Sequence, residues 1–297
     1  MILSCNNISK SFGTDVIIKS CSFNIEDHEK AAIVGINGAG KSTLLKIITG
    51  IEPADTGLVT LAKDKTLGYL SQQQNLNSDN TIYDELLSVK QYILDMEAQL
   101  RSIENQMKSA DDTALETLMK KYSDLNHEFE LNNGYAYKSE ITGVLKGLGF
   151  AEEDFTLNVN TLSGGQKTRV ALGRLLLSKP DIILLDEPTA MLDPHGRDEV
   201  MKTVKMLNEQ GVTIVLITHY MEEAAQAQRV VVIDGGEVIM DNVPKKIFSN
   251  VETMKNLGLD VPQVTELCWE LKRAGYDIST EIIHEDECVQ KLYEMLK

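Results

Sequence analysis

The stretch that decides the fold reads Gly35-Ile36-Asn37-Gly38-Ala39-Gly40-Lys41-Ser42. It matches the pattern G-x-x-x-x-G-K-[ST] and lies between a β-rich run, residues 31–34, and a helix-forming segment, residues 41–48. Small residues let backbone N–H groups close around phosphate oxygens at the start of a helix. The pattern therefore predicts a nucleotide site in which Lys41 reaches the β- and γ-phosphates and the Ser42 hydroxyl binds Mg²⁺. The residues expected to contact ATP here are Gly35, Ile36, Asn37, Gly38, Ala39, Gly40, Lys41, Ser42 and Thr43.

A second candidate site follows the apolar run 182–185, which ends in Asp186 and Glu187. A buried parallel strand delivers Asp186 at its carboxyl end, beside the phosphate-binding loop, where a Mg²⁺ ligand or an acceptor for one belongs. Glu187 is then placed to polarise the attacking water. Such a strand end is also a common structural feature, so this interpretation depends on the phosphate-binding loop.

Short β-rich runs alternate with helical segments along much of the chain, which indicates an α/β fold. The expected strands cover residues 2–4, 16–25, 31–34, 57–61, 66–70, 182–185, 213–217, 230–233 and 237–240. The helices expected around them cover residues 41–48, 167–177, 197–208 and 221–227. Beyond Pro244 the chain is polar and helical. We predict a nucleotide-binding domain over residues 1–245, whose N-terminal subdomain is rich in β-structure, and a small helical appendage over residues 246–297.

The middle of the chain carries apolar side chains at alternating steps of three and four. They fall at residues 93, 96, 100, 103 and 107, and again at residues 115, 118, 122, 125 and 129. Two such stripes joined by the polar turn 109–112 predict an antiparallel helical hairpin, inserted at about 86–134 in a helical subdomain. The alternative is a pair of amphipathic helices lying on a core. The narrow stripe favours a projecting hairpin, because core helices usually show a wider apolar face.

The composition is that of a globular protein. Of 297 residues, 42% are hydrophobic and 25% are charged, and the apolar runs are too short to span a bilayer or form a signal peptide. The net charge of −16 disfavours broad contact with nucleic-acid phosphates. The four cysteines have no metal-binding spacing, so we expect buried, reduced thiols in the cytoplasm. They are Cys5, Cys21, Cys268 and Cys288.

The sequence Leu162-Ser163-Gly164-Gly165-Gln166 precedes the predicted helix 167–177. Its serine and its glycine amides would offer a second anion-binding helix N-terminus. The plain alternative is a helix N-cap with flexible glycines. This LSGGQ resembles the signature of the ABC (ATP-binding cassette) ATPase superfamily, and the resemblance covers residues 1 to about 245. In that family the signature closes on the γ-phosphate held by a partner cassette, which implies a P-loop fold and two ATP molecules sandwiched between two cassettes.

The resemblance also assigns a catalytic set and a set of metal ligands. Gln72 resembles the Q-loop glutamine, which touches Mg²⁺ and senses the γ-phosphate. His219, after the predicted strand 213–217, resembles the switch histidine that contacts the γ-phosphate. The implied catalytic residues are therefore Glu187, His219 and Gln72. The implied Mg²⁺ ligands are Ser42, Gln72 and Asp186.

Two further positions match the family. Asp193 resembles the D-loop aspartate that communicates across the dimer. Phe12 resembles the A-loop aromatic residue that stacks on adenine, although a lone phenylalanine is more often part of a core. The partner cassette is a second copy of this chain or a different chain, and the sequence leaves both open.

The resemblance divides between two branches of the superfamily. Residues 1 to about 185, with the hairpin, resemble the first cassette of an ABC-F protein, a soluble class whose arm helices enter the ribosome. Residues from about 186 to 297 resemble an ATPase subunit of an energy-coupling factor transporter. ABC-F cassettes usually carry Asn-His where this chain has Ala190-Met191. A natural recombinant, an engineered hybrid and a misassembled reading frame all remain open.

The charge of the arm and the resemblance of residues 186–297 to a transporter subunit favour the transporter branch. Residues 90–135 carry five basic and nine acidic side chains, a net charge of −4, whereas an arm among RNA phosphates should be positive. Against it, the arm occupies the region on which a transporter cassette receives its membrane partner. We predict the ATP-hydrolysing motor of a membrane transporter, held on the inner face of the cell membrane by its partner subunits. The alternatives are a ribosome-associated translation factor and an ATP-gated clamp with little turnover.

Overall fold

The computed structural model describes residues 1–72, 76, 79–190 and 192–296. Met191, which belongs to the expected D-loop, lies outside the described residues. The backbone forms two compact units. Unit 1 joins Met1–Gln73 to Pro180–Lys297, and unit 2 covers Gln74–Lys179.

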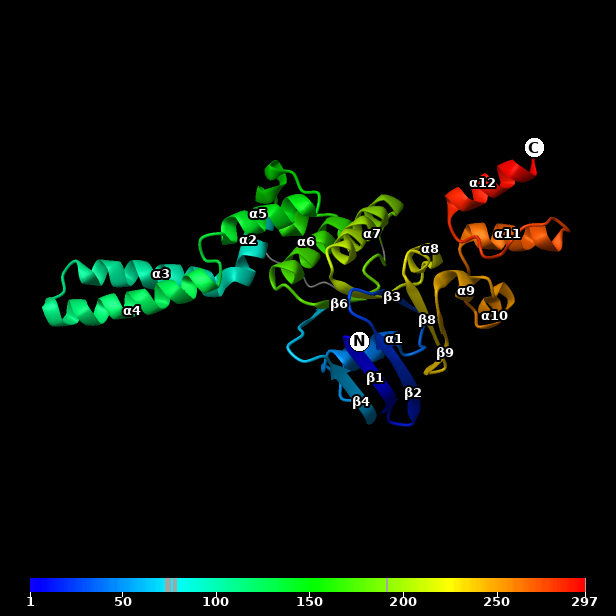
Figure 1. Ribbon diagram of the computed structural model, residues 1–297, viewed down its shortest axis with the longest axis horizontal. Helices are drawn as coiled ribbons and strands as arrows, with labels where there is room; N and C mark the ends of the chain where they lie inside the picture. Colours follow the sequence, from blue (N-terminus) through cyan, green and yellow to red (C-terminus); the bar gives the residue numbers. More distant parts are fainter. Residues whose placement is uncertain (73–75, 77–78, 191, 297) are drawn as a thin grey trace. The chain divides into compact units, whose positions relative to one another are not determined.

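Unit 1 is built on a nine-stranded sheet in the order β4-β1-β2-β9-β8-β3-β7-β6-β5 (Figure 1). The strands are β1 (Leu3–Phe12), β2 (Asp15–Ile25), β3 (Lys30–Val34), β4 (Thr56–Leu61), β5 (Leu67–Leu70), β6 (Ile182–Asp186), β7 (Thr213–Ile217), β8 (Arg229–Asp234) and β9 (Glu237–Asn242). Parallel pairing joins β5 to β6, β6 to β7, β7 to β3 and β3 to β8. Antiparallel pairing joins β1 to β2 and β4, and β8 to β9. The sheet therefore has the parallel part expected of an α/β fold and a β-rich N-terminal part.

The central strands explain why the parallel part forms. Every residue of β3, β6 and β7 is buried, and their sequences are dominated by Ile, Leu, Val and Ala. Such continuous apolar runs are typical of parallel strands covered on both faces. Because the carboxyl ends of parallel strands lie at one edge of a sheet, the segments that follow β3, β5, β6 and β7 gather there.

Seven helices are described in unit 1. They are α1 (Lys41–Ile48), α7 (Pro194–Glu209), α8 (Met221–Ala224), α9 (Pro244–Phe248), α10 (Val251–Asn256), α11 (Gln263–Arg273) and α12 (Glu285–Met295). The first tail helices share a core with the sheet, since Phe248 and Val251 belong to the same buried cluster as Val34 and Val232. The tail thus packs on the sheet from α9 onward, and the boundary at residue 246 stays a prediction.

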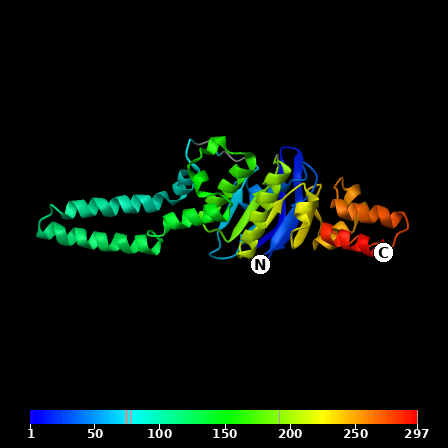
Figure 2. The same cartoon turned by 90° about the horizontal axis from the view of Figure 1, so that it is seen from above.

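Unit 2 is helical. Its elements are α2 (Ile82–Leu87), the 3₁₀ turn η1 (Ser88–Lys90), α3 (Gln91–Met107), α4 (Asp112–Leu131), α5 (Tyr137–Gly147), η2 (Glu152–Thr156), η3 (Val159–Thr161) and α6 (Gly164–Leu177). Helices α3 and α4 run side by side in both views (Figures 1 and 2), and the Tyr122 hydroxyl donates to Glu104 across them at 3.0 Å. Asp111 caps α4 by accepting a hydrogen bond from the Ala114 N–H. Two adjacent helices therefore lie where the hairpin was predicted, and their being an insertion in the cassette stays a prediction.

The two ends of this hairpin differ in burial. At its base Ile93, Leu100 and Phe129 are buried, and the Tyr137 hydroxyl of α5 donates to Glu97 at 3.1 Å. Toward the turn the side chains are mostly exposed, since α3 and α4 cover only each other. The base is therefore part of the core of unit 2, and the outer half is an arm in solvent.

The largest departures from the expected element boundaries have local causes. Strand β1 is longer than predicted because it continues through register shifts between Cys5 and Ile8, where polar residues break the apolar pattern. Helix α8 ends at Ala224 rather than residue 227.

Within the described ranges no helix is both long and apolar enough to cross a membrane. All four cysteines are buried with free thiols, as predicted.

Candidate nucleotide-binding site

Strand register in unit 1 brings the predicted catalytic residues together. Leu70 of β5 is paired with Leu185 of β6, so Gln72 and Glu187 follow their strands at equivalent positions. Strand β7 lies on the other side of β6, with Ile217 opposite Asp186, and His219 follows two residues later. Three segments far apart in the sequence therefore meet at the carboxyl edge of the sheet.

The phosphate-binding loop connects β3 to α1 at this edge. A Cβ on Gly35 would lie 2.2 Å from the carbonyl oxygen of Ile233 in β8, so only glycine fits. Gly40 precedes α1 with a φ of 93°, which side chains disfavour, and a Cβ there would lie 3.0 Å from the Ile17 carbonyl oxygen. Close packing of this loop against β8 and β2 thus requires glycine at both positions.

Lys41 closes the loop from inside. Its Nζ donates to the carbonyl oxygens of Gly35 at 2.8 Å and Ile36 at 3.0 Å, and the residue is buried. Burial lowers the pKa of Lys41, while the nearby carboxylates of Glu187 and Asp186 act in the opposite direction. An anion in the loop would stabilise this buried ammonium, which is the property required of a phosphate-binding lysine.

Asp186 is the buried acceptor at the end of β6. Its Oδ1 accepts from the Ser42 hydroxyl at 2.9 Å, and its Oδ2 accepts from the Tyr69 hydroxyl at 3.2 Å. Burial raises the pKa of Asp186, partly offset by these two hydrogen bonds, and the neighbouring charge of Glu187 raises it further. A cation bound here would relieve the cost of this buried negative charge.

The donor set of this site fits Mg²⁺. A hydroxyl and a carboxylate are hard oxygen ligands, which Mg²⁺ prefers, and Ser42 and Asp186 bring one of each within 2.9 Å. In the part of the chain that the structure describes, no group of three or more His, Cys, Asp or Glu side chains is arranged to hold a metal by itself. The ion would therefore complete its shell with phosphate oxygens and water.

Glu187 lies between the other two predicted catalytic residues. Its Oε2 accepts from the Gln72 Nε2 at 3.0 Å, and its Oε1 lies 2.7 Å from the His219 Nε2. Glu187 has a φ of 49°, an uncommon left-handed conformation for a residue with a side chain. Strained backbone of this kind is concentrated at functional sites, where surrounding contacts hold it in place.

Phe12 and Asp193 occupy positions compatible with their expected roles. Phe12 ends β1 with 49% of its surface exposed, and the Lys10 ammonium lies 5.3 Å from its ring centroid. It is therefore not a core residue, although its stacking on adenine stays a prediction. Asp193 is exposed and caps α7 by accepting from the Gly196 N–H at 3.3 Å.

The signature belongs to unit 2, where it starts helix α6. Ser163 is the N-cap, and it exchanges hydrogen bonds with Gln166 in a capping box. Leu162 and Gly165 are buried, whereas Ser163 and Gly164 are exposed. The alternative interpretation of this sequence as a helix N-cap is therefore confirmed. An exposed serine and glycine at a 14-residue helix start also leave that terminus open to an anion.

Sequence reasoning missed several polar residues around the site. Tyr69 holds Asp186, and Glu223 accepts hydrogen bonds from Thr189 and Thr218. Tyr69 carried a weak signal, because it lies in the strand that leads to Gln72. Nothing local separated Glu223 from its neighbour in the sequence, since its contacts come from two other loops.

Comparison with known proteins identifies the family. The family model described as ABC transporter matches residues 18–190. The energy-coupling factor transporter ATP-binding protein EcfA1 of Clostridium novyi (strain NT) is 35% identical over 307 aligned residues, covering 99% of this chain and 98% of that protein. EcfA1 of Clostridium perfringens (strain 13 / Type A) is 60% identical over 135 residues, covering 45% of this chain and 48% of that protein. This chain therefore spans about half the length of the second relative.

A solved structure gives the same assignment. The dimeric post-hydrolysis state of the ATP-binding cassette MJ0796 bound to ADP and Pi aligns with a TM-score of 0.58 at 26% identity, covering 82% of this chain and 99% of that one. The similarity to EcfA1 extends over the whole chain, including the part that we compared with ABC-F proteins. The comparisons do not support the ABC-F resemblance. This chain belongs to the ABC transporter family of ATP-binding cassettes.

Proposed function

We propose that this chain is the ATP-binding motor subunit of an energy-coupling-factor-type membrane transporter. The observation that carries the enzymatic part is the position of Glu187, 3.0 Å from Gln72 and 2.7 Å from His219, beside a glycine loop closed by Lys41. The transport part is supported by 35% identity to EcfA1 over 99% of the chain.

In this proposal the loop residues Gly35–Ser42 bind ATP through their amide groups, and Lys41 moves from its two carbonyl partners to the β- and γ-phosphates. Ser42, Gln72 and Asp186 hold Mg²⁺, which neutralises charge on the phosphates when bound. Tyr69 keeps the Asp186 carboxylate turned toward Ser42.

Hydrolysis then depends on Glu187. Its carboxylate takes a proton from a water molecule as the water oxygen attacks the γ-phosphorus, and the bond to the bridging oxygen of ADP breaks. Gln72 and His219 approach the two oxygens of Glu187 from opposite neighbouring strands, so they limit the directions in which it can point. His219 is also the group expected to contact the γ-phosphate.

A second cassette completes the site in this proposal. The exposed Ser163 and Gly164, with Gly165, face the γ-phosphate held by the partner, and Asp193 lies at the contact between the two. Two identical copies would form a self-complementary two-fold interface, and a related but different chain would form a pseudo-symmetric one. The dimeric ADP and Pi complex of MJ0796 supports such an arrangement.

The first test compares Glu187→Gln with Glu209→Gln. Glu209 is an exposed carboxylate at the end of α7, and it serves as the matched control. Losing the general base at Glu187 should lower kcat by about 10²–10⁴-fold and leave ATP binding intact. Steady-state phosphate release and nucleotide binding measure the two properties separately. Wild-type turnover in Glu187→Gln contradicts the catalytic assignment.

The second test concerns partners and location. Tagged wild-type chain and its Glu187→Gln form are purified from detergent-solubilised membranes, and the copurifying proteins are identified. An integral membrane subunit in stoichiometric amount supports the motor role and a peripheral position on the inner face of the membrane. ATP-dependent cosedimentation of Glu187→Gln with ribosomes, lost when the arm tip at residues 101–125 is removed, contradicts it.

A further inference from the structure

A buried carboxylate outside the predicted site is connected to both of its catalytic loops. Glu223 lies in α8 with 5% of its surface exposed. Its Oε2 accepts from the Thr189 hydroxyl at 2.9 Å and from the Thr218 hydroxyl at 2.6 Å. Both donors are themselves buried, so neither hydroxyl can exchange this partner for bulk water.

The two threonines belong to the segments that carry the catalytic side chains. Thr189 follows Glu187 by two residues, and Thr218 immediately precedes His219. The Thr218 hydroxyl also accepts from the Tyr220 N–H at 3.0 Å, which fixes its proton toward Glu223. A single carboxylate oxygen thus joins the backbone after β6 to the backbone after β7.

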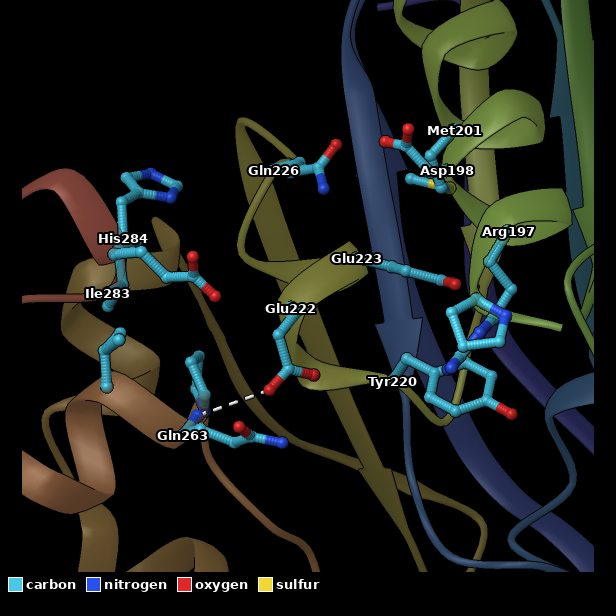
Figure 3. A pocket seen from close by; sticks show the side chains of 14 residues that line it. Arg197, Asp198, Met201, Tyr220, Glu222, Glu223, Gln226, Gln263, Ile283 and His284 are labelled. Atoms are coloured by element: carbon cyan, nitrogen blue, oxygen red, sulfur yellow. Dashed lines mark hydrogen bonds between the residues drawn. The ribbon is translucent and has the colours of Figure 1, made fainter.

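The second oxygen of Glu223 has a different environment. Oε1 is sealed from solvent and accepts no hydrogen bond from the residues that the structure describes. Figure 3 shows the side chain pointing from α8 toward Arg197 of α7, whose guanidinium stacks 4.2 Å from the Tyr220 ring centroid. Burial raises the pKa of Glu223, and the two hydroxyls and Arg197 counteract this effect. Glu223 is thus held by hydroxyls from two segments, with the positive charge of Arg197 on the side of α7.

Its neighbour Glu222 provides a contrast. Glu222 is exposed and accepts from the Gln263 N–H at 3.3 Å (Figure 3). Both glutamates line a pocket of about 670 Å³ between α7, α8 and the tail, but only Glu223 is buried. Glu222 contacts neither catalytic loop in the hydrogen bonds described. Of these two adjacent glutamates, Glu223 therefore hydrogen-bonds to the loops after β6 and β7, whereas Glu222 bonds to the tail at the surface.

We propose that Glu223 is a positioning residue for ATP hydrolysis, which fixes the separation of Glu187 and His219 through Thr189 and Thr218. The proposal rests on the ATPase function proposed above. The Glu187 Oε1 and the His219 Nε2 are only 2.7 Å apart, and in the proposed function both side chains act at one γ-phosphate. Loosening either loop therefore changes the geometry at the reacting atoms. Misplacement of about 1 Å can lower a rate by about 100-fold without weakening substrate binding.

Four substitutions separate positioning from simple packing. Glu223→Gln keeps an oxygen that can accept both hydroxyls and has the same shape. Glu223→Leu fills the space but removes the acceptor. Thr189→Val and Thr218→Val each remove one donor to Glu223 at nearly constant volume, and Thr218→Val also removes the oxygen that accepts from the Tyr220 N–H. The matched controls are Glu222→Leu on the same helix and Thr203→Val, a buried threonine whose hydroxyl donates to the Glu199 carbonyl of its own helix.

The test measures kcat and KM for ATP and nucleotide affinity for the full chain in the complex in which it purifies. We expect Glu223→Leu to lower kcat by about 10–100-fold, with KM and nucleotide affinity changed less than about threefold. Glu223→Gln should recover most of kcat. Both threonine variants should lower kcat in the wild-type background. In Glu223→Leu, Thr189→Val should lower kcat no further, because its hydroxyl acts through Glu223. Thr218→Val also removes the acceptor of the Tyr220 N–H, so the test of additivity uses Thr189→Val. Both controls should retain wild-type kcat.

Other outcomes overturn the proposal. Near-wild-type kcat in folded Glu223→Leu, an equal loss of affinity and kcat, or a fully additive effect of Thr189→Val would each show that Glu223 is only a core residue. If Glu223→Leu does not fold, the two threonine variants decide alone, since unchanged kcat in both refutes the connection. A wild-type complex without ATPase activity refutes the proposed function itself, whereas active wild-type and active Glu223→Leu refute only this inference.

Discussion

The charge on Asp186 should make the nucleotide-free protein less stable than it could be. Asp186 is 4% exposed, and burial raises its pKa above the ordinary value of 3.8. A carboxyl whose pKa is raised by folding contributes most to stability below the unfolded pKa, and this contribution is lost as pH rises through the folded value. At neutral pH the ionised side chain therefore costs free energy of folding.

We predict that Asp186→Asn raises the free energy of unfolding without nucleotide at pH 7, because it removes a buried negative charge. The expected gain is on the order of 1 kcal/mol, the usual size of the effect of one substitution. The asparagine can still accept from the Ser42 hydroxyl, and it can donate to the Tyr69 oxygen. The advantage should shrink as pH falls through the raised pKa of the folded wild-type carboxyl, because that carboxyl is then protonated and uncharged.

The same substitution should remove the stabilisation that Mg²⁺ adds with ATP. Ligand at 100 times its Kd stabilises a folded protein by about 2.7 kcal/mol. Wild type should gain more stability from Mg-ATP than from ATP with EDTA. Asp186→Asn should gain equally little from both, because it lacks the carboxylate that favours the cation.

Urea unfolding at pH 4 to 8, with EDTA, ATP or Mg-ATP, measures all of these effects. Asp181→Asn, at the residue just before β6, is the matched control. Hydrogen bonds from Thr66 and Lys65 lower the pKa of Asp181 to about 2, so its stabilisation is complete above pH 3.8 and lost as pH falls through 2. Asp181→Asn should therefore lower the free energy of unfolding by about 1 kcal/mol, because solvent screens the charge of Asp181 at this partly exposed site. If Asp186→Asn is destabilised like Asp181→Asn, or keeps the Mg²⁺-dependent gain, the reasoning is wrong.

Three further predictions concern other parts of the chain. Gly35→Ala should unfold at lower temperature or fail to accumulate, because its Cβ would lie 2.2 Å from a backbone carbonyl oxygen of β8. The control is Gly143→Ala in α5, whose Cβ would meet no atom within 4 Å, and it should be neutral or stabilising in thermal melts. Burial raises the pKa of Cys5 and Cys21 to about 12, so a disulfide reagent at pH 8 should label them only at the rate of unfolding, and rapid native labelling would contradict this. Replacing residues 101–125 by a short glycine linker should leave nucleotide affinity and melting temperature unchanged, since these residues lie outside the buried base of the hairpin.

Local patterns predicted the elements whose identity is fixed by their own residues. Helix α1 covers the predicted residues 41–48 because the glycine loop and Gly50 define both of its ends. Strand β7 matches residues 213–217 for a similar reason, since an apolar run lies between polar residues. The hairpin was predictable because the seam is formed by two stripes that are close in sequence.

Parts of the site that depend on long-range register were not predictable in the same way. Pairing of β5, β6 and β7 brings Gln72 and His219 to Glu187, and the sequence indicated this only through resemblance to a family. Glu223 had no signal at all. A buried charge on a short, partly polar helix looks like a surface residue until the loops that supply its hydrogen bonds are known.

The nucleotide site combines several features that each oppose folding. Lys41 has a lowered pKa and Asp186 a raised one, both chiefly through burial, and Glu187 has left-handed backbone geometry. In the proposed function a bound ligand would relieve or use each feature: phosphate would stabilise the ammonium, a cation would stabilise the carboxylate, and the attacking water would contact the glutamate. The same edge of the sheet is therefore the place where ligand binding should increase stability most.

Because Glu223 ties two of the loops at this edge together, that gain should extend along the hydrogen bonds to Thr189 and Thr218 and into α8. Slower amide exchange at α8 on nucleotide binding, abolished in Glu223→Leu, is the observable consequence.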